Sequence, residues 1–85
     1  MNSKYEIDLT KDFLKQVKKL DYSIQKMVFK KIELLKSNPY KGKPLQNILK
    51  NYRSLRVKSF RIIYRVVEDE KIIKILKIGH KNHVY

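Results

Sequence analysis

The apolar residues at the start of the chain first alternate with polar ones and then recur at helical spacing. The segment KYEID (4–8) alternates as a half-exposed strand does, and we predict a strand there. Thr10 is a favourable N-cap residue. Phe13, Val17 and Leu20 follow it at i, i+4, i+7, which predicts a helix with one apolar stripe.

A second helix is predicted directly after the first. Asp21 can cap its start, and the dipeptide Asn38-Pro39 ends it, because a residue before proline is disfavoured in the helical region. Its apolar positions share one face: Ile24, Val28, Ile32 and Leu35. Since the break near Asp21 is short, we expect the two helices to form an antiparallel hairpin.

The second half of the chain contains three runs typical of β-strands. They follow an irregular connection (38–51) and read YRSLRV (52–57), FRIIYRVV (60–67) and KIIKILKI (71–78). We therefore predict one domain over residues 1–85 of the α+β class. It has an N-terminal strand, a two-helix hairpin and an antiparallel three-strand meander (β-α-α-β-β-β), with the helices on one face of an antiparallel sheet.

The turn between the first two of these runs predicts their register. If Lys58 and Ser59 form its tip, Arg56 lies opposite Arg61. One face of this hairpin is then mostly apolar: Leu55, Val57, Phe60, Ile62, Tyr64 and Val66. The other carries Ser54, Arg56, Arg61, Ile63 and Arg65. Two adjacent guanidiniums repel each other and would suit a phosphate or an acidic patch; the alternative is that both side chains extend apart into solvent.

Charge is the strongest feature of the composition. The chain has 21 Lys and Arg against 8 Asp and Glu, a formal net charge of +13. The three acidic residues after position 36 are Glu68, Asp69 and Glu70, which form the turn between the last two strands. So large a positive charge in a small domain favours a polyanionic partner. Nucleic acid is the first candidate and an acidic protein the second, while a merely solubilising surface is the remaining alternative.

Composition also excludes several classes of function. The chain has no cysteine, which removes disulfides, thiolate metal sites and cysteine nucleophiles. It contains no apolar stretch of membrane-spanning length, and MNSKYEIDL lacks the apolar core of a signal peptide. We therefore expect a cytoplasmic protein without a metal or other cofactor.

The last seven residues, GHKNHVY (79–85), contain both histidines of the chain. We expect this tail to leave the sheet after Ile78. A metal bound by His80 and His83 would need further ligands, and the sequence offers no cysteine and no nearby carboxylate. A metal-free acid–base site for RNA cleavage is the functional alternative, since histidine titrates near neutral pH. From the residues alone, a simple chain end is the more economical interpretation.

The C-terminal third of the chain resembles a known family. The segment LRVKSFRIIYRVVEDEKIIKILKIGHKNHVY (55–85) is similar to the C-terminal signature of the RelE/ParE superfamily of type II toxins. FLKQVKKLD (13–21) and NPYKGKPL (38–45) fit the helical hairpin and following loop of that family. The resemblance implies a small domain with two helices against an antiparallel sheet. It also implies, for the RelE branch, cleavage of mRNA in the ribosomal A site without metal.

The resemblance implies a set of site residues. Arg56 matches a strand cation that contacts the reacting phosphate, and Arg61 matches the arginine that stabilises the transition state. Lys81 matches a phosphate stabiliser or general acid, and Tyr85 a terminal aromatic that stacks on the nucleotide. Supporting or RNA-binding positions are Arg53, Lys58, Arg65, His80 and His83. Two residues depart from the family pattern: Ser54 stands where relatives carry a second strand lysine, and Lys81 replaces an arginine.

The resemblance also implies partners. They are a RelB-like acidic antitoxin encoded by an adjacent gene, in a toxin–antitoxin heterotetramer, together with the ribosome and mRNA. Two alternatives stay open. The superfamily includes ParE-like inhibitors of DNA gyrase, which are not enzymes, and a degenerate member could bind its antitoxin without being toxic.

Overall fold

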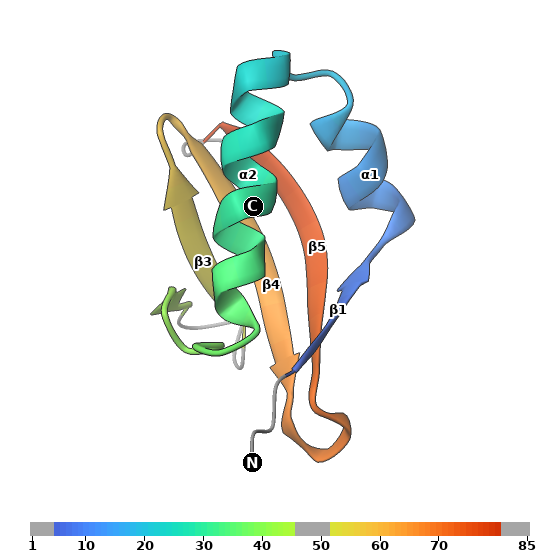
Figure 1. The fold of residues 1–85 in the computed structure, drawn as a ribbon, viewed down its shortest axis with the longest axis vertical. Coiled ribbons are helices and arrows are strands. Elements are labelled where there is room, and N and C mark those ends of the chain that lie inside the picture. Colours follow the sequence, from blue (N-terminus) through green and yellow to red (C-terminus); the bar gives the residue numbers. More distant parts are fainter. Residues whose placement is uncertain (1–4, 46–51, 81–85) are drawn as a thin grey trace.

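The computed structural model describes residues 5–45 and 52–80. Two helices lie against one face of a five-stranded sheet (Figure 1). In chain order the elements are β1 (Glu6–Leu9), α1 (Lys11–Val17), α2 (Tyr22–Leu35), β2 (Lys43–Pro44), β3 (Tyr52–Val57), β4 (Phe60–Val67), a 3-10 turn (Glu68–Glu70) and β5 (Ile72–His80). The predicted α+β fold is confirmed, and β3, β4 and β5 form the predicted antiparallel meander.

The strand order is β1-β5-β4-β3-β2, which corrects two expectations. The irregular connection contains a short edge strand, β2, that pairs antiparallel with β3. The sheet is mixed rather than antiparallel, because β1 runs parallel to β5. The helices explain this direction: α1 continues upward from β1 and α2 returns the chain, so the meander of β3, β4 and β5 ends with a strand that runs along β1 (Figure 1).

The starts of both helices lie where the sequence places them. The Thr10 side-chain oxygen accepts a hydrogen bond from the Phe13 amide at 3.3 Å, so the predicted cap is confirmed. Asp21 occupies the N-cap position of α2, but its side chain makes no capping hydrogen bond. The Thr10 hydroxyl also lies 2.8 Å from the carbonyl of Ile75 and 3.1 Å from that of Leu76. One side chain therefore starts α1 and ties it to β5.

The core lies between the helices and the sheet, as the apolar pattern predicts. Its helical members are Phe13, Val17, Val28, Ile32 and Leu35. Its strand members are Leu55, Val57, Ile62, Tyr64, Ile73, Ile75 and Ile78. Leu20 and Ile24 pack against this cluster while staying partly exposed. None of the described helices has the length and apolar character that a membrane-spanning helix requires.

The β3–β4 register agrees with the prediction residue by residue, including Arg56 opposite Arg61 and Val57 opposite Phe60. The next pairing contains an irregularity. Ile63 pairs with Lys77 whereas Tyr64 pairs with Ile75, so Leu76 is an extra residue in β5. This bulge lets both Ile75 and Ile78 face the core, which strict alternation would forbid. β5 also continues to His80, so the expectation that the chain leaves the sheet after Ile78 is wrong.

Candidate functional site

The sheet face opposite the helices collects positive charge. The register places six cations on this side, which we call the cationic face: Lys43, Arg56, Arg61, Arg65, Lys74 and Lys77. Ile63 lies among them and is only 2% exposed. Asp8, which pairs with Lys74 in the outer strand β1, brings an acidic residue to one margin of this face. A concentration of cations on one face is the pattern expected of a surface that binds nucleic acid.

Arg56 and Arg61 form the centre of a pocket at one end of the cationic face. The pocket has a volume of about 280 Å³ and is lined by Lys41, Gly42, Lys43, Ser54, Leu55, Arg56 and Arg61. Four of these residues are cationic and none is acidic. Arg56 is exposed, and its Nε donates a hydrogen bond to the carbonyl of Lys58 at 3.2 Å, whereas Arg61 is half-buried. The structure therefore brings together the two arginines that the sequence pairs.

The loop that supplies Lys41 and Lys43 is held by contacts with the strands beneath it. The Gly42 amide donates to the Tyr64 hydroxyl at 2.9 Å, and that hydroxyl donates to the Pro39 carbonyl at 2.8 Å. A Cβ atom at position 42 would lie 2.5 Å from the Ser54 carbonyl oxygen and 2.7 Å from the Tyr64 hydroxyl. Glycine is needed here because the backbone of the loop approaches the strands closely.

Arg53 fastens the same loop from the core-facing side of β3. Its Nε donates to the Gly42 carbonyl at 3.0 Å and its Nη2 to the Tyr40 carbonyl at 3.3 Å, while its guanidinium carbon lies 5.1 Å from the centre of the Tyr40 ring. Burial raises the pKa of the Tyr64 hydroxyl beside it, which keeps that group protonated and able to donate. In this arrangement Arg53 organises the loop and lies on the opposite side of β3 from Arg56.

An exposed carboxylate ties the other end of this loop to the rest of the sheet. Glu68 accepts hydrogen bonds from the hydroxyls of Tyr40 and Tyr5, and Lys71 lies 3.3 Å from its second oxygen. Mainly because of the hydrogen bond from Tyr40, the pKa of Glu68 falls to about 2. The same bond raises the pKa of Tyr40 to about 12. Glu68 thus joins the residue before β1, the loop and the β4–β5 turn.

The remaining predicted residues lie at several places. Lys58 is at the tip of the β3–β4 turn with a φ of 56°, a left-handed conformation. Arg65 lies on the cationic face, with its guanidinium carbon 6.0 Å from the Tyr52 ring centre. His80 pairs with Phe60, and their ring centres are 5.1 Å apart, so it lies on the helix side of the sheet, away from Arg61. Lys81, His83 and Tyr85 are outside the described residues.

The sequence reasoning missed three cations of the cationic face, Lys43, Lys74 and Lys77, and a fourth, Lys41, that lines its pocket. The signal for Lys41 and Lys43 is their place on either side of Gly42, because glycine is favoured where the backbone approaches another group closely. Lys74 and Lys77 could not be assigned to one face by alternation, since the bulge at Leu76 lies between them. Within residues 5–45 and 52–80, no three His, Cys, Asp or Glu side chains gather as metal ligands.

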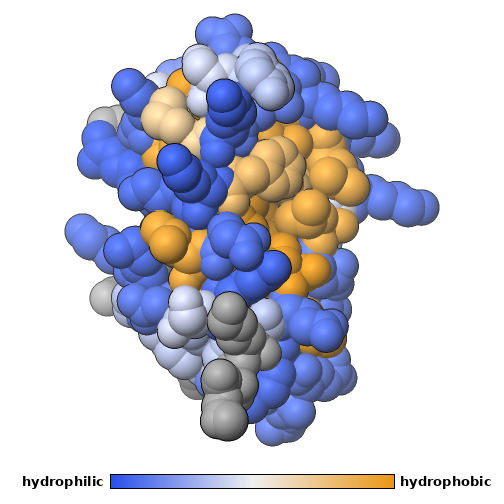
Figure 2. All heavy atoms as spheres, viewed as in Figure 1, coloured by the Kyte–Doolittle hydropathy of each residue, from blue (hydrophilic) through white to orange (hydrophobic). Residues whose placement is uncertain are grey.

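The helix side of the molecule has a different character. Figure 2 shows apolar side chains exposed beside α2 among hydrophilic ones. Leu14 is 37%, Phe29 38% and Leu34 52% exposed. A broad groove of about 880 Å³ follows α2 and is lined by Tyr22, Ser23, Gln25, Lys26, Met27, Phe29 and Lys30. This surface combines apolar contacts with a lysine rim.

Comparison with known proteins identifies the family of this chain. The family model of the ParE toxin of type II toxin–antitoxin systems (parDE) matches residues 7–85. A RelE-like toxin protein of Escherichia coli is 31% identical over 80 residues, which cover 92% of this chain and 84% of that protein.

Solved structures show the same fold. The toxin–antitoxin complex RelBE2 of Mycobacterium tuberculosis contains a chain with a TM-score of 0.83 and 26% identity, covering 92% of both chains. The archaeal RelE–RelB complex of Pyrococcus horikoshii gives a TM-score of 0.83 over 95% of this chain and 99% of that one; at 21% identity it speaks for the fold alone. With its fold and most of its sequence matched, this chain belongs to the RelE/ParE family of type II toxins.

Proposed function

We propose that this toxin is a metal-independent, ribosome-dependent mRNA endonuclease that inhibits translation in the cytoplasm. The observation that carries the proposal is the pocket lined by Arg56 and Arg61, which are partners on neighbouring strands, together with Lys41 and Lys43. Because four of the described residues that line the pocket are cationic and none of them is acidic, the pocket suits the phosphodiester backbone of RNA.

The chemistry is an attack within the RNA chain. A base removes the proton of a 2′-hydroxyl, the new P–O2′ bond forms, the P–O5′ bond breaks, and an acid protonates the departing 5′-oxygen. The products are a 2′,3′-cyclic phosphate and a 5′-hydroxyl end. The phosphorane-like transition state carries extra negative charge, and preorganised cations stabilise it more than they stabilise the ground state.

The residues divide between charge stabilisation and proton transfer. Arginine stays protonated in proteins, so Arg56 contacts the reacting phosphate and Arg61 stabilises the transition state, but neither transfers the protons. In this proposal Lys81 acts as phosphate stabiliser or general acid and Tyr85 stacks on the nucleotide. Arg53, Lys58, Arg65, His80 and His83 are the supporting positions. Arg53 acts by holding the loop at Tyr40 and Gly42, and His80 by packing against Phe60 on the helix side of the sheet.

The proposed partners are the ribosome, mRNA and a RelB-like acidic antitoxin, in a toxin–antitoxin heterotetramer. Two of the similar solved structures described above are complexes of a toxin with its antitoxin. The groove along α2, with its apolar side chains between Lys26 and Lys30, suits an acidic amphipathic segment of such an antitoxin. A short acidic open reading frame next to the toxin gene is expected.

Mapping RNA ends after controlled expression tests the activity. Total RNA is treated with a kinase before ligation, because the proposed cut leaves a 5′-hydroxyl. Codon-phased cuts are expected in translated messages and not in a matched message whose start codon is removed. Growth arrest with intact messages would rule out the endonuclease.

A second function is favoured by the family model, which is that of ParE. In this alternative the protein inhibits DNA gyrase without catalysis. A supercoiling assay with purified gyrase distinguishes the two, since the endonuclease should leave supercoiling unchanged. A degenerate member that only binds its antitoxin would change neither messages nor supercoiling.

A further inference from the structure

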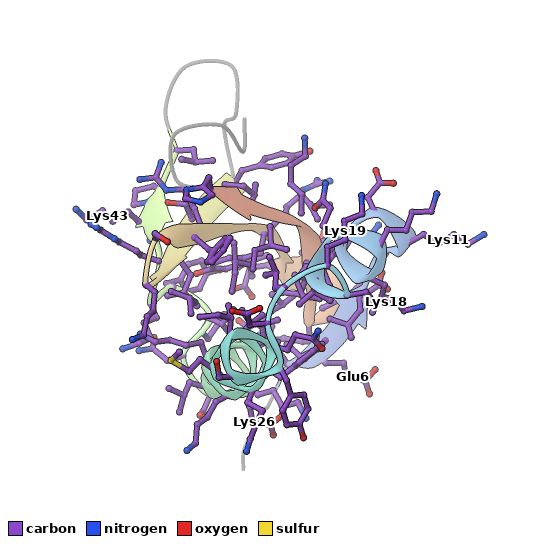
Figure 3. All side chains as sticks on the ribbon, turned by 90° about the horizontal axis from the view of Figure 1, so that it is seen from above. Glu6, Lys11, Lys18, Lys19, Lys26 and Lys43 are labelled. Atoms are coloured by element: carbon purple, nitrogen blue, oxygen red, sulfur yellow. The ribbon has the colours of Figure 1, made fainter. Side chains whose placement is uncertain are left out.

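The edge strand β2 is well placed to bind the RNA backbone. Lys43 pairs with Ser54 of β3, so its side chain starts from the same sheet face as Arg56 and Arg61. Figure 3 shows Lys43 extending from one edge of the molecule, whereas Lys11 and Lys18 extend from the opposite edge, beside α1. Lys43 is exposed, and Ser54 next to it is a small buried residue that leaves the pocket open.

Charge balance indicates that the pocket takes more than one phosphate. A phosphodiester carries a single negative charge, while the pocket lining includes Lys41, Lys43, Arg56 and Arg61. One phosphate at the arginine pair would leave the two lysines without a counter-charge from the ligand. A polyanion with successive phosphates reduces their mutual repulsion as well.

The sheet geometry separates the two groups of cations. Neighbouring strands are about 4.8 Å apart and two residues along a strand span about 6.6 Å, so the Lys43 backbone lies about 8 Å from that of Arg56. Lys43 therefore lies on the β2 side of the arginine pair, at the edge of the sheet. The loop that carries Lys41 and Lys43 is fixed at Gly42 by Tyr64 and Arg53, which reduces the entropy lost on binding.

We propose that Lys43, with Lys41 beside it, binds a second backbone phosphate of the RNA chain, adjacent to the phosphate at Arg56 and Arg61. This inference rests on the proposed action on RNA and extends the site to the edge strand β2. The RNA then crosses the end of the sheet from β4 to β2. Lysine on an edge strand also discourages pairing with other chains, as does Pro44. That protective role alone would give Lys43 no part in RNA binding.

Salt dependence of binding separates these roles. The probe is a short 2′-O-methyl oligoribonucleotide labelled for fluorescence anisotropy, which lacks the 2′-hydroxyl needed for cleavage. Each phosphate contact to a single strand contributes about 0.7 to the slope of log K against log salt. Lys43→Gln should therefore lower the slope by about 0.7. Raising the salt from 50 to 200 mM weakens binding by a certain factor for each protein. That factor should be about 2.6-fold smaller for Lys43→Gln than for the wild type.

Two variants control for charge and for folding. Lys11→Gln removes the same charge at the opposite edge and should leave the slope unchanged, and Lys43→Arg should keep it. Lys41→Gln combined with Lys43→Gln should also lower the slope by about 0.7, because both lysines serve one phosphate. Inorganic phosphate should displace the oligonucleotide poorly. The inference is overturned by an unchanged slope in a folded Lys43→Gln variant, by an equal change in Lys11→Gln, by efficient displacement with inorganic phosphate, or by no binding of the probe.

The probe cannot be cleaved, so the two proposals can fail separately. If the wild type cuts no mRNA but Lys43→Gln lowers the slope, the second phosphate contact stands and the endonuclease falls. If the wild type cuts mRNA and Lys43→Gln binds with the wild-type slope, the endonuclease stands and the β2 contact falls.

Discussion

Replacing Gly42 by alanine tests how the loop beside the cationic pocket is held. Its φ is not in the left-handed region, so an alanine has no backbone penalty and would, in an open loop, stabilise the protein by about 0.4–1 kcal/mol through the unfolded chain. Steric crowding at this position reverses the sign, so that alanine lowers the free energy of unfolding. The added Cβ would lie 2.5 Å from the Ser54 carbonyl oxygen and 2.7 Å from the Tyr64 hydroxyl, and the first of these is backbone.

The cost follows from the contacts that must move. Separating the loop from β3 breaks the two hydrogen bonds of the buried Tyr64 hydroxyl, to Gly42 and Pro39. A buried group left unsatisfied costs about 1–3 kcal/mol. From the middle of each range, a loss of about 2 kcal/mol less a gain of about 0.7 kcal/mol, we expect Gly42→Ala to lower the free energy of unfolding by about 1–2 kcal/mol. A domain of this size has roughly 4–13 kcal/mol in total, so the variant should still fold.

Urea unfolding followed by circular dichroism measures this change, and a double-mutant cycle locates it. Tyr64→Phe removes one of the two obstructing atoms and both hydrogen bonds. Gly42→Ala should therefore cost less in the Tyr64→Phe background than in the wild type. A Gly42→Ala variant as stable as the wild type, or costs that simply add, would refute the close approach of this loop to the strands.

Three other substitutions test parts of the same framework. Thr10→Ala should cost about 1–2 kcal/mol in urea unfolding because it removes the α1 cap and the contact with β5, whereas Thr10→Ser should retain most of the stability; equal stability of Thr10→Ala would contradict the cap. Lys58→Gly should keep or raise stability by up to about 1 kcal/mol, because Lys58 has a φ of 56°, while Lys58→Val should lower it; the reverse order would contradict that turn. The carboxyl of Glu68 has its pKa lowered from 4.5 to about 2, so it contributes stability that is complete above pH 4.5 and lost as the pH falls toward 2. In urea midpoints measured against pH, the wild type should lose its advantage over Glu68→Gln across that window, and parallel curves would argue against the hydrogen bonds from Tyr40 and Tyr5.

Local patterns were sufficient to predict most of the fold. The β3–β4 hairpin was predictable because its alternation and short turn allow one register that buries Leu55 and Ile62 together. The Thr10 cap and the apolar stripes of the helices are similarly local. The parallel pairing of β1 with β5 was not predictable in this way, since it joins residues 66 positions apart, such as Glu6 and Ile72. The bulge at Leu76 depends on which isoleucines the core accommodates.

The candidate site was predictable only in its centre. Arg56 and Arg61 are close in sequence and their pairing follows from one turn. Lys43 joins them because β2, a two-residue strand containing proline, pairs with β3, and so short a strand has no periodic pattern of its own. The role of Arg53 could not be predicted, because it depends on where the folded loop places the carbonyls of Tyr40 and Gly42. His80 was a candidate because histidine titrates near neutral pH, but the strand register places it beside Phe60.

The proposal that the arginine pair stabilises RNA cleavage is tested most directly on programmed ribosomes. Purified protein is mixed in excess with ribosomes that hold a defined mRNA codon in the A site, and the single-turnover rate of cleavage is measured. Wild-type protein should cut within that codon and leave a 5′-hydroxyl. Loss of a preorganised group that stabilises transition-state charge costs about 10²–10³ in rate, so Arg61→Ala should be slower by that factor, while Lys11→Ala should keep the wild-type rate. An intact mRNA with wild-type protein, or an undiminished rate in a folded Arg61→Ala variant, would contradict the account.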